Sequence, residues 1–211
     1  MAEPDTRPLK DQVVSEAFKV IAEAGVEALS LRAIAKRLGV SHQAPYKHFA
    51  SRDHILAEVV ARSFETFATH LEARPRSENG FEDLGFMGRA YLEFAMTHPL
   101  QYRLMFNTAL PDIDDHPDML AKSQRAFSIL HERLYTIPLS DPGGNLDQPA
   151  KHDAMFIWAT LHGCCSILSS DVAKTLPLTD QDKADTMDRM MRRLSMALGE
   201  HDTKSTHEAK S

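Results

Sequence analysis

Basic side chains gather in one short stretch of this 211-residue chain, where no carboxylate balances them. Between Ser30 and Arg52 the sequence has five basic residues and no Asp or Glu: Arg32, Lys36, Arg37, Lys47 and Arg52. The whole chain carries a formal charge of −6, so the rest of it carries −11. Cations that neutralise DNA phosphates release counterions, and a basic island on an acidic protein is typical of a nucleic-acid contact. A solvated basic face on a helical hairpin is the alternative interpretation.

Two short helices around a glycine turn are predicted to position these side chains. The apolar residues of the first recur at i, i+3, i+4 and i+7: Leu31, Ile34, Ala35 and Leu38. Ser30 can cap this helix, and Gly39 can end it in the left-handed conformation. Ser41 is expected to cap a second helix of under two turns, in which an early Pro45 is tolerated because first-turn amides lack helical partners. This pattern predicts a helix-turn-helix with a recognition helix.

The order of residues from 9 to 56 resembles the N-terminal domain of TetR-family transcriptional regulators. The shared motifs are Gly25, LSLRxIA from Leu29, LGVS from Leu38, YxHF from Tyr46 and SRDxIL from Ser51. Gln43 and Pro45 depart from the Gly, Ala or aliphatic residues that are usual there. We therefore expect operator DNA to be contacted by ten residues: Ser30, Arg32, Ser41, His42, Gln43, Ala44, Tyr46, Lys47, His48 and Arg52.

The rest of the sequence keeps a helical period, which predicts an all-α chain of about nine helices. We expect a DNA-binding domain at 1–50, a connecting helix at 51–74, a ligand-binding and dimerisation domain at 75–199, and a disordered tail at 200–211. No apolar run reaches 18 residues and the polar N-terminus lacks a signal segment. The sequence therefore predicts no membrane span and a cytoplasmic protein.

Aromatic and methionine side chains are concentrated after residue 80, which suits a cavity for a small apolar effector. The candidate ligand contacts are Phe86, Met87, Tyr91, Phe94, Tyr102, Met105, Phe106, Phe127, Met155, Trp158 and His162. Trp158, His162 and Gly163, together with the HPLQYRLMF run from His98, are similar to one branch of TetR-like C-terminal domains. The alternative for each of these residues is a plain hydrophobic core.

The TetR resemblance also implies a homodimer, with a four-helix interface formed by residues 150–171 and 180–198 of both copies. The second of these helices has an apolar face made of Met187, Met190, Met191, Leu194 and Leu198. We expect this face to form the seam, with Leu194 within it.

Enzyme chemistry has no support in the sequence, which contains no nucleophile elbow, P-loop or dinucleotide-binding glycine pattern. The acidic cluster Asp112, Asp114, Asp115, His116 and Asp118 fits neither a calcium loop nor a helical zinc pair, so we expect no metal and no cofactor. The predicted function is a repressor that an apolar effector releases from DNA. Two alternatives remain open: an architectural DNA-binding protein without a ligand, and a dimeric helical module that has lost DNA binding.

Overall fold

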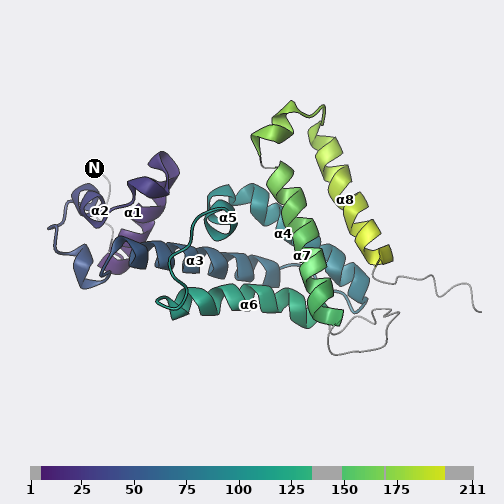
Figure 1. The fold of residues 1–211 in the computed structure, drawn as a ribbon, viewed down its shortest axis with the longest axis horizontal. Coiled ribbons are helices and arrows are strands. Elements are labelled where there is room, and N and C mark those ends of the chain that lie inside the picture. The colour runs from purple at the N-terminus through teal and green to yellow at the C-terminus, as the bar shows by residue number, and fades with distance from the viewer. Residues whose placement is uncertain (1–5, 135–148, 169, 198–211) are drawn as a thin grey trace, which may run out of the picture. The chain divides into compact units, whose positions relative to one another are not determined.

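The computed structural model describes residues 6–134, 149–168 and 170–197, and every regular element within these ranges is helical (Figure 1). The elements follow in this order: α1 (Leu9–Ala24), η1 (Val26–Ala28), α2 (Leu31–Leu38), η2 (Pro45–Lys47), α3 (Arg52–Glu72), α4 (Gly80–Thr97), α5 (Pro99–Phe106), α6 (Pro117–Leu134), α7 (Pro149–Leu168), η3 (Asp171–Thr175) and α8 (Asp180–Ala197). The predicted all-α fold is confirmed. None of the described helices has both the length and the apolar character needed to cross a membrane.

The expected second helix of the helix-turn-helix is not an α-helix, which corrects the prediction from sequence. The chain instead makes turns that lead into η2, a 3₁₀ helix. Backbone N–H groups of Ala44, Lys47 and His48 donate to carbonyls three residues earlier, at 3.0, 3.3 and 3.0 Å. Pro45 has no N–H to donate to Ser41, so an α-helical bond cannot form there. The predicted tail and the loop at 135–148 lie outside the described residues.

The chain divides into two compact units that both draw on α3 and α6. One unit takes in Met1–Ala68 and His98–Ala126, and the other takes in Thr69–Thr97 and Phe127–Ser211. Two long helices therefore run out of the first unit and into the second. The predicted division into DNA-binding and ligand-binding domains is a functional one and stays a prediction.

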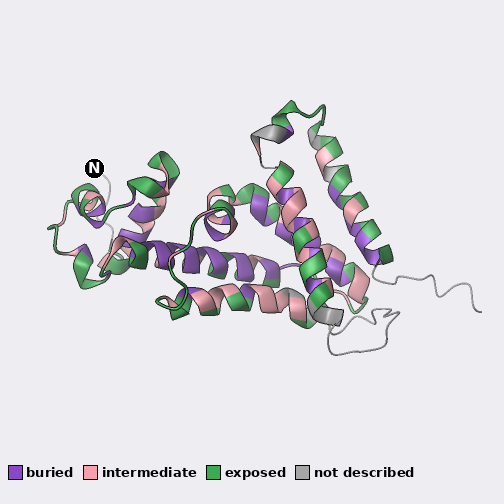
Figure 2. Cartoon of the chain, in the orientation of Figure 1, coloured by how far each residue is buried: buried purple, intermediate pink, exposed green. Residues whose placement is uncertain are grey.

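The core of the first unit is built along α3, whose buried residues form the long purple stretch in Figure 2. Apolar residues recur there at helical spacing, as one buried face requires. The buried α3 side chains of this unit include Ile55, Leu56, Val59, Val60, Phe64 and Phe67. The ring of Phe106 on α5 meets Phe64 and Phe67 edge-on, with centroids 5.9 and 6.3 Å away. This aromatic contact joins α5 to α3.

In the second unit α4 packs against α7 and α8. Gly88 on α4 lies against Met191 on α8, and a Cβ built on Gly88 would stand 2.4 Å from the Met191 sulfur. A larger residue at position 88 would therefore have to displace the end of the Met191 side chain. Ile157, Leu161 and Met187 complete the buried side of α7 and α8.

Candidate functional site

Helix α2 is positioned by the capping residues that the sequence predicted. The Ser30 hydroxyl accepts a hydrogen bond from the Ala33 N–H at 3.0 Å, and Gly39 ends the helix with φ 68° in the left-handed region. Leu31, Ile34 and Ala35 are buried, and α2 packs on α1. Arg32 and Lys36, on the opposite side of α2, are exposed to solvent.

The recognition segment, residues 41–49, is held by two buried side chains. Pro45 and Phe49 are both buried, and the Nζ of Lys10 lies 5.9 Å from the Phe49 ring centroid. Ala44 is half-buried. The remaining predicted contact residues of this segment are exposed: Ser41, His42, Gln43, Tyr46, Lys47 and His48. Polar donors and one aromatic ring therefore face outward from an anchored turn.

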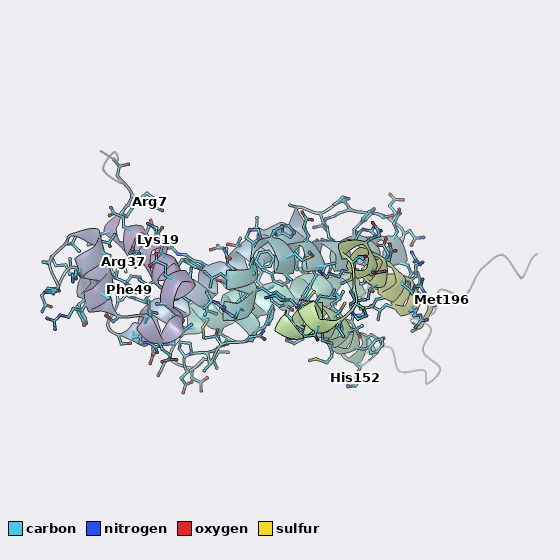
Figure 3. The ribbon with its side chains drawn as sticks, turned by 90° about the horizontal axis from the view of Figure 1, so that it is seen from above. Arg7, Lys19, Arg37, Phe49, His152 and Met196 are labelled. Carbon is cyan, nitrogen blue, oxygen red and sulfur yellow. The ribbon has the colours of Figure 1, made fainter. Side chains whose placement is uncertain are left out.

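Arg37 belongs to the basic island by sequence, but its guanidinium is engaged within the domain. It contacts the carboxylates of Glu16 and Glu23 on α1, and its bonds to Glu23 measure 2.7 and 2.9 Å. Hydrogen bonding to Glu23, and next to Glu16, raises the pKa of Arg37. Burial would raise the pKa of Glu16, but hydrogen bonds from Lys19 and Arg37 outweigh it and lower that pKa. Lys19 and Arg37 come from α1 and α2 of the same unit (Figure 3).

Arg52, a predicted phosphate contact, ties the start of α3 to η1. Its Nη2 donates to the Val26 carbonyl at 2.9 Å and lies 3.6 Å from a Glu27 carboxylate oxygen. Its Nη1 is 3.6 Å from an Asp53 oxygen. The Arg52 side chain is 37% exposed, so part of it still faces solvent.

Three cations of the basic island have no ion-pair partner within the described part of the chain: Arg32, Lys36 and Lys47. All three are exposed. Arg32 and Lys36 are four residues apart on α2 and so share a face. Lys36 was not among the predicted contacts, although its four-residue spacing from Arg32 could have indicated it.

The acidic cluster at 112–118 makes contacts with its own backbone, with α6 and with α3. The Asp112 carboxylate accepts the Asp114 N–H at 3.1 Å, and Asp118 lies 3.6 Å from Lys122. The His116 ring meets His54 edge-on, with centroids 4.9 Å apart. Across the described residues no three His, Cys, Asp or Glu side chains are grouped to hold a metal ion.

Four of the predicted ligand contacts meet in the second unit, on α4, α6 and α7. The Trp158 indole N–H donates to the Tyr91 hydroxyl at 3.3 Å, and that hydroxyl lies 3.5 Å from Nδ1 of His162. The Phe127 ring stands edge-on to Trp158 at 5.9 Å. Burial lowers the pKa of His162, which favours the neutral imidazole. The result is an aromatic cluster with a polar centre.

The other predicted ligand contacts lie elsewhere. Tyr102, Met105 and Phe106 belong to the first unit, where Tyr102 and Phe106 have ring centroids 5.1 Å apart. Phe94 and Met87 are buried in the second unit, and the Phe94 ring is 5.6 Å from that of His70. Phe86 is half-buried with the Arg89 guanidinium 5.0 Å from its ring, and Met155 is 50% exposed.

The predicted seam on α8 faces the interior of its own unit, which corrects the expectation for Leu194. Met187, Met191 and Leu194 are 2%, 4% and 3% exposed, because this face packs on α4. Met190 is half-buried, and Leu198 lies outside the described residues.

Other apolar side chains are exposed on α7 and α8, and we call this set the open apolar surface. Its large residues are Met155, Phe156 and Ile167 on α7 and Met196 on α8, at 49–68% exposure. A Cβ built on Gly163 would meet no atom within 4 Å, so the space over this glycine is open. The helical spacing of Phe156, Gly163 and Ile167 could have indicated this face from the sequence.

Two known protein families match this chain, one at each end. Residues 85–194 match the family described as Tetracyclin repressor-like, C-terminal domain, and residues 13–59 match bacterial regulatory proteins of the tetR family. The chain belongs to the TetR family. Proteins of this family, including the relatives below, are transcriptional regulators and not enzymes. The resemblance stated from the sequence is confirmed.

Curated relatives match this TetR-family chain over part of their length. The HTH-type transcriptional regulator Rv1816 of Mycobacterium tuberculosis is 26% identical over 117 residues, which cover 54% of this chain and 50% of that protein. TcmR of Streptomyces glaucescens is 25% identical over 143 residues, covering 67% and 63%. The chain thus spans about half the length of the first of these relatives.

Solved structures share the fold over most of both chains. The regulatory protein SCO4313 is 25% identical, with a TM-score of 0.69 and coverage of 88% of this chain and 94% of that one. FadR from Bacillus subtilis, solved with stearoyl-CoA, is 15% identical, with a TM-score of 0.64 and coverage of 88% and 97%. At 15% identity the likeness shows the fold alone.

Proposed function

We propose that this TetR-family protein is a cytoplasmic repressor that binds a double-stranded DNA operator as a homodimer and releases it when a small, largely apolar effector binds. The observation that carries the proposal is the anchored recognition segment, whose polar side chains face outward beside three cations without a partner in the described chain. Family membership supports the same conclusion.

The contacts divide by chemistry into positioning and reading residues. Lys47, Arg32 and Lys36 are free to neutralise phosphates, which fix the register of a protein on DNA without carrying sequence information. Gln43 and His42 can reach base edges, where an amide can bond an adenine in two places. The remaining predicted contacts support these from the turn and the α2 cap: Ser30, Ser41, Ala44, Tyr46, His48 and the exposed side of Arg52.

Lys47→Ala is expected to weaken binding to all DNA sequences alike and to reduce the slope of log K against log salt by about one. The reason is the loss of one phosphate contact. Gln43→Ala is expected to cost about 1–3 kcal/mol on the preferred operator only. Fluorescence anisotropy of labelled operator and scrambled duplex at several salt concentrations measures both.

Arg103→Ala is the matched control for this experiment, because it removes an exposed cation from α5, outside the basic island. It should leave the salt slope unchanged. If Lys47→Ala keeps the wild-type slope on the scrambled duplex, the phosphate contacts lie elsewhere.

We place the effector at the cluster of Tyr91, Trp158, His162 and Phe127. Flat aromatic walls favour an apolar ligand, while the Tyr91 hydroxyl and the neutral His162 ring offer polar groups that fix its orientation. The effect of ligand binding can reach the unit that holds the recognition segment, since α3 and α6 contribute residues to both units. A ligand that binds one position of these helices more tightly than another shifts the protein toward that position. The change in DNA affinity is limited by the difference between the ligand's two affinities.

Titrating candidate apolar compounds against Trp158 fluorescence, with and without operator, tests this coupling. Trp158 is the only tryptophan in the chain, so its signal is unambiguous. An effector is expected to bind roughly 5–150-fold more weakly to the operator complex, because coupling of about 1–3 kcal/mol acts equally in both directions. Equal affinity in both conditions would show a binding site without a switch.

The open apolar surface on α7 and α8 is the proposed dimer interface. Phe156 and Ile167 flank Gly163, and an interhelical contact at a glycine brings two helices close together. A second copy explains the surface best, because one recognition segment is too small to be selective and two can read successive major grooves about 34–36 Å apart.

A further inference from the structure

Helix α8 has an outward face opposite the buried side that packs on α4. Met187, Met191 and Leu194 define the buried side. Seven exposed residues of α8 lie on the opposite side: Asp182, Asp185, Thr186, Arg189, Arg192, Arg193 and Met196. Figure 2 shows exposed and buried residues on different sides of α8, and Figure 3 labels Met196 near its end. We call these seven residues the α8 stripe.

Charge is segregated along the α8 stripe, with carboxylates in its first half and guanidinium groups in its second. The helix dipole accounts for part of this pattern. Asp182 accepts from the Thr179 hydroxyl and N–H at 2.6 and 2.8 Å, and these bonds lower its pKa. Asp185 accepts from the Gln181 amide at 2.8 Å. The acidic half is therefore ordered by local hydrogen bonds.

The basic half has no such partners. Arg189 and Arg192 follow Asp185 and Asp188 by four residues, a spacing at which ion pairs can form within a helix. Even so, neither these two arginines nor Arg193 forms an ion pair with any residue that the structure describes. Three guanidinium groups are left for another molecule.

We infer that α8 pairs with α8 of a second copy in antiparallel orientation, with Asp185 facing Arg189 of that copy and Asp182 facing Arg192. Both pairs are centred on position 187, so one twofold axis forms both of them. A parallel arrangement would place each charge against itself and is repulsive. Helix α8 packs against α7 in the same unit. The inference rests on the proposed homodimer and adds an orientation and a rule for self-recognition.

Charge reversal at the central pair gives a direct test in the full-length protein. Asp185→Arg makes the stripe entirely basic at its centre, and Arg189→Asp makes it entirely acidic. Each single variant is expected to dimerise at least about tenfold more weakly than wild type, because two attractive contacts become two repulsive ones. An equimolar mixture of the two is expected to form heterodimers in preference to either homodimer, and the double variant Asp185→Arg, Arg189→Asp should regain wild-type affinity.

Native mass spectrometry on two differently tagged chains measures the heterodimer fraction, and sedimentation velocity measures the dissociation constants. Arg76→Asp is the matched control, since it reverses an exposed arginine of the same unit outside α8 and should dimerise normally. Circular dichroism confirms that each variant is folded.

Statistical mixing of the two single variants, with no preference for the heterodimer, would overturn the inference. So would wild-type dimerisation by either single variant; if Phe156→Glu is monomeric in the same assay, the proposed homodimer stands and only the α8 pairing fails. A monomeric wild-type protein would overturn both.

Discussion

Phe156→Glu is expected to turn the protein into a monomer and to lower operator affinity by more than about 100-fold. Phe156 is 49% exposed in the single chain, so glutamate there is solvated and the monomer keeps its fold. In the proposed dimer each copy buries its own residue 156 in the interface. An unpaired carboxylate in an apolar interface costs several kcal/mol. A monomer binds only one half-site, so the affinity gained by binding two half-sites at once is lost. Sedimentation velocity and operator titration measure the two effects.

Gly163→Leu tests the same surface by shape instead of charge. The space around its Cβ is empty within 4 Å, so the single chain accepts a larger side chain, while a helix of a second copy seated there does not. Met96→Glu is the matched control, because Met96 is 63% exposed on α4, a helix that contributes no residue to the proposed interface. A Phe156→Glu protein that sediments as a dimer and binds operator normally would place the interface elsewhere. Leu194→Arg cannot make this distinction, since Leu194 is buried within its own chain.

The parts of the fold that local sequence determines were predictable. The hydroxyl of Ser30, the left-handed Gly39 and the apolar spacing of α2 act within a few residues of each other, so the sequence shows them directly. The long apolar face of α3 was equally clear, because about six turns of one 21-residue helix repeat the same period. These elements were found where they were expected.

Features that depend on distant parts of the chain were not predictable in the same way. Arg37 and Arg52 look like phosphate contacts until Glu16, Glu23 and the Val26 carbonyl are brought to them by the packing of α1, α2 and η1. Periodicity likewise showed that α8 has an apolar face but not what covers it. Only the fold shows that this face lies against α4.

The candidate ligand site illustrates both cases. Trp158 and His162 are four residues apart and so share a helix face, and the structure places Tyr91 of α4, also a predicted contact, between their polar atoms. Composition grouped Tyr102 and Phe106 with them, because aromatic content carries no information about which helices meet. Those two rings instead contact each other, and Phe106 packs against α3 in the other unit.

The link between α3 and α4 contains a buried ion pair that the polar, Pro- and Gly-containing sequence there did not suggest. Arg74 and Asp83 have side chains only 1% and 4% exposed, and their closest atoms are 3.0 Å apart. Arg74 also donates to the Leu71 carbonyl at 2.7 Å, and the Asp83 carboxylate accepts the Ser77 N–H at 3.2 Å. The pair therefore fastens the end of α3 to the start of α4, the helix that carries Tyr91.

Arg74→Leu is expected to lower the free energy of unfolding by about 3–5 kcal/mol, because it leaves the Asp83 carboxylate buried without its partner. Urea unfolding of the full-length protein, followed by circular dichroism, measures the change. Arg76→Leu is the matched control, since Arg76 is exposed in the same link and should change stability by less than about 0.5 kcal/mol. The double variant Arg74→Leu, Asp83→Leu should recover much of the loss, because replacing both charges with apolar groups removes the uncompensated one. If Arg74→Leu unfolds like wild type, the pair is solvated in solution and does not fasten α4, and the position of Tyr91 must then depend on the packing of α4 against α7 and α8 alone.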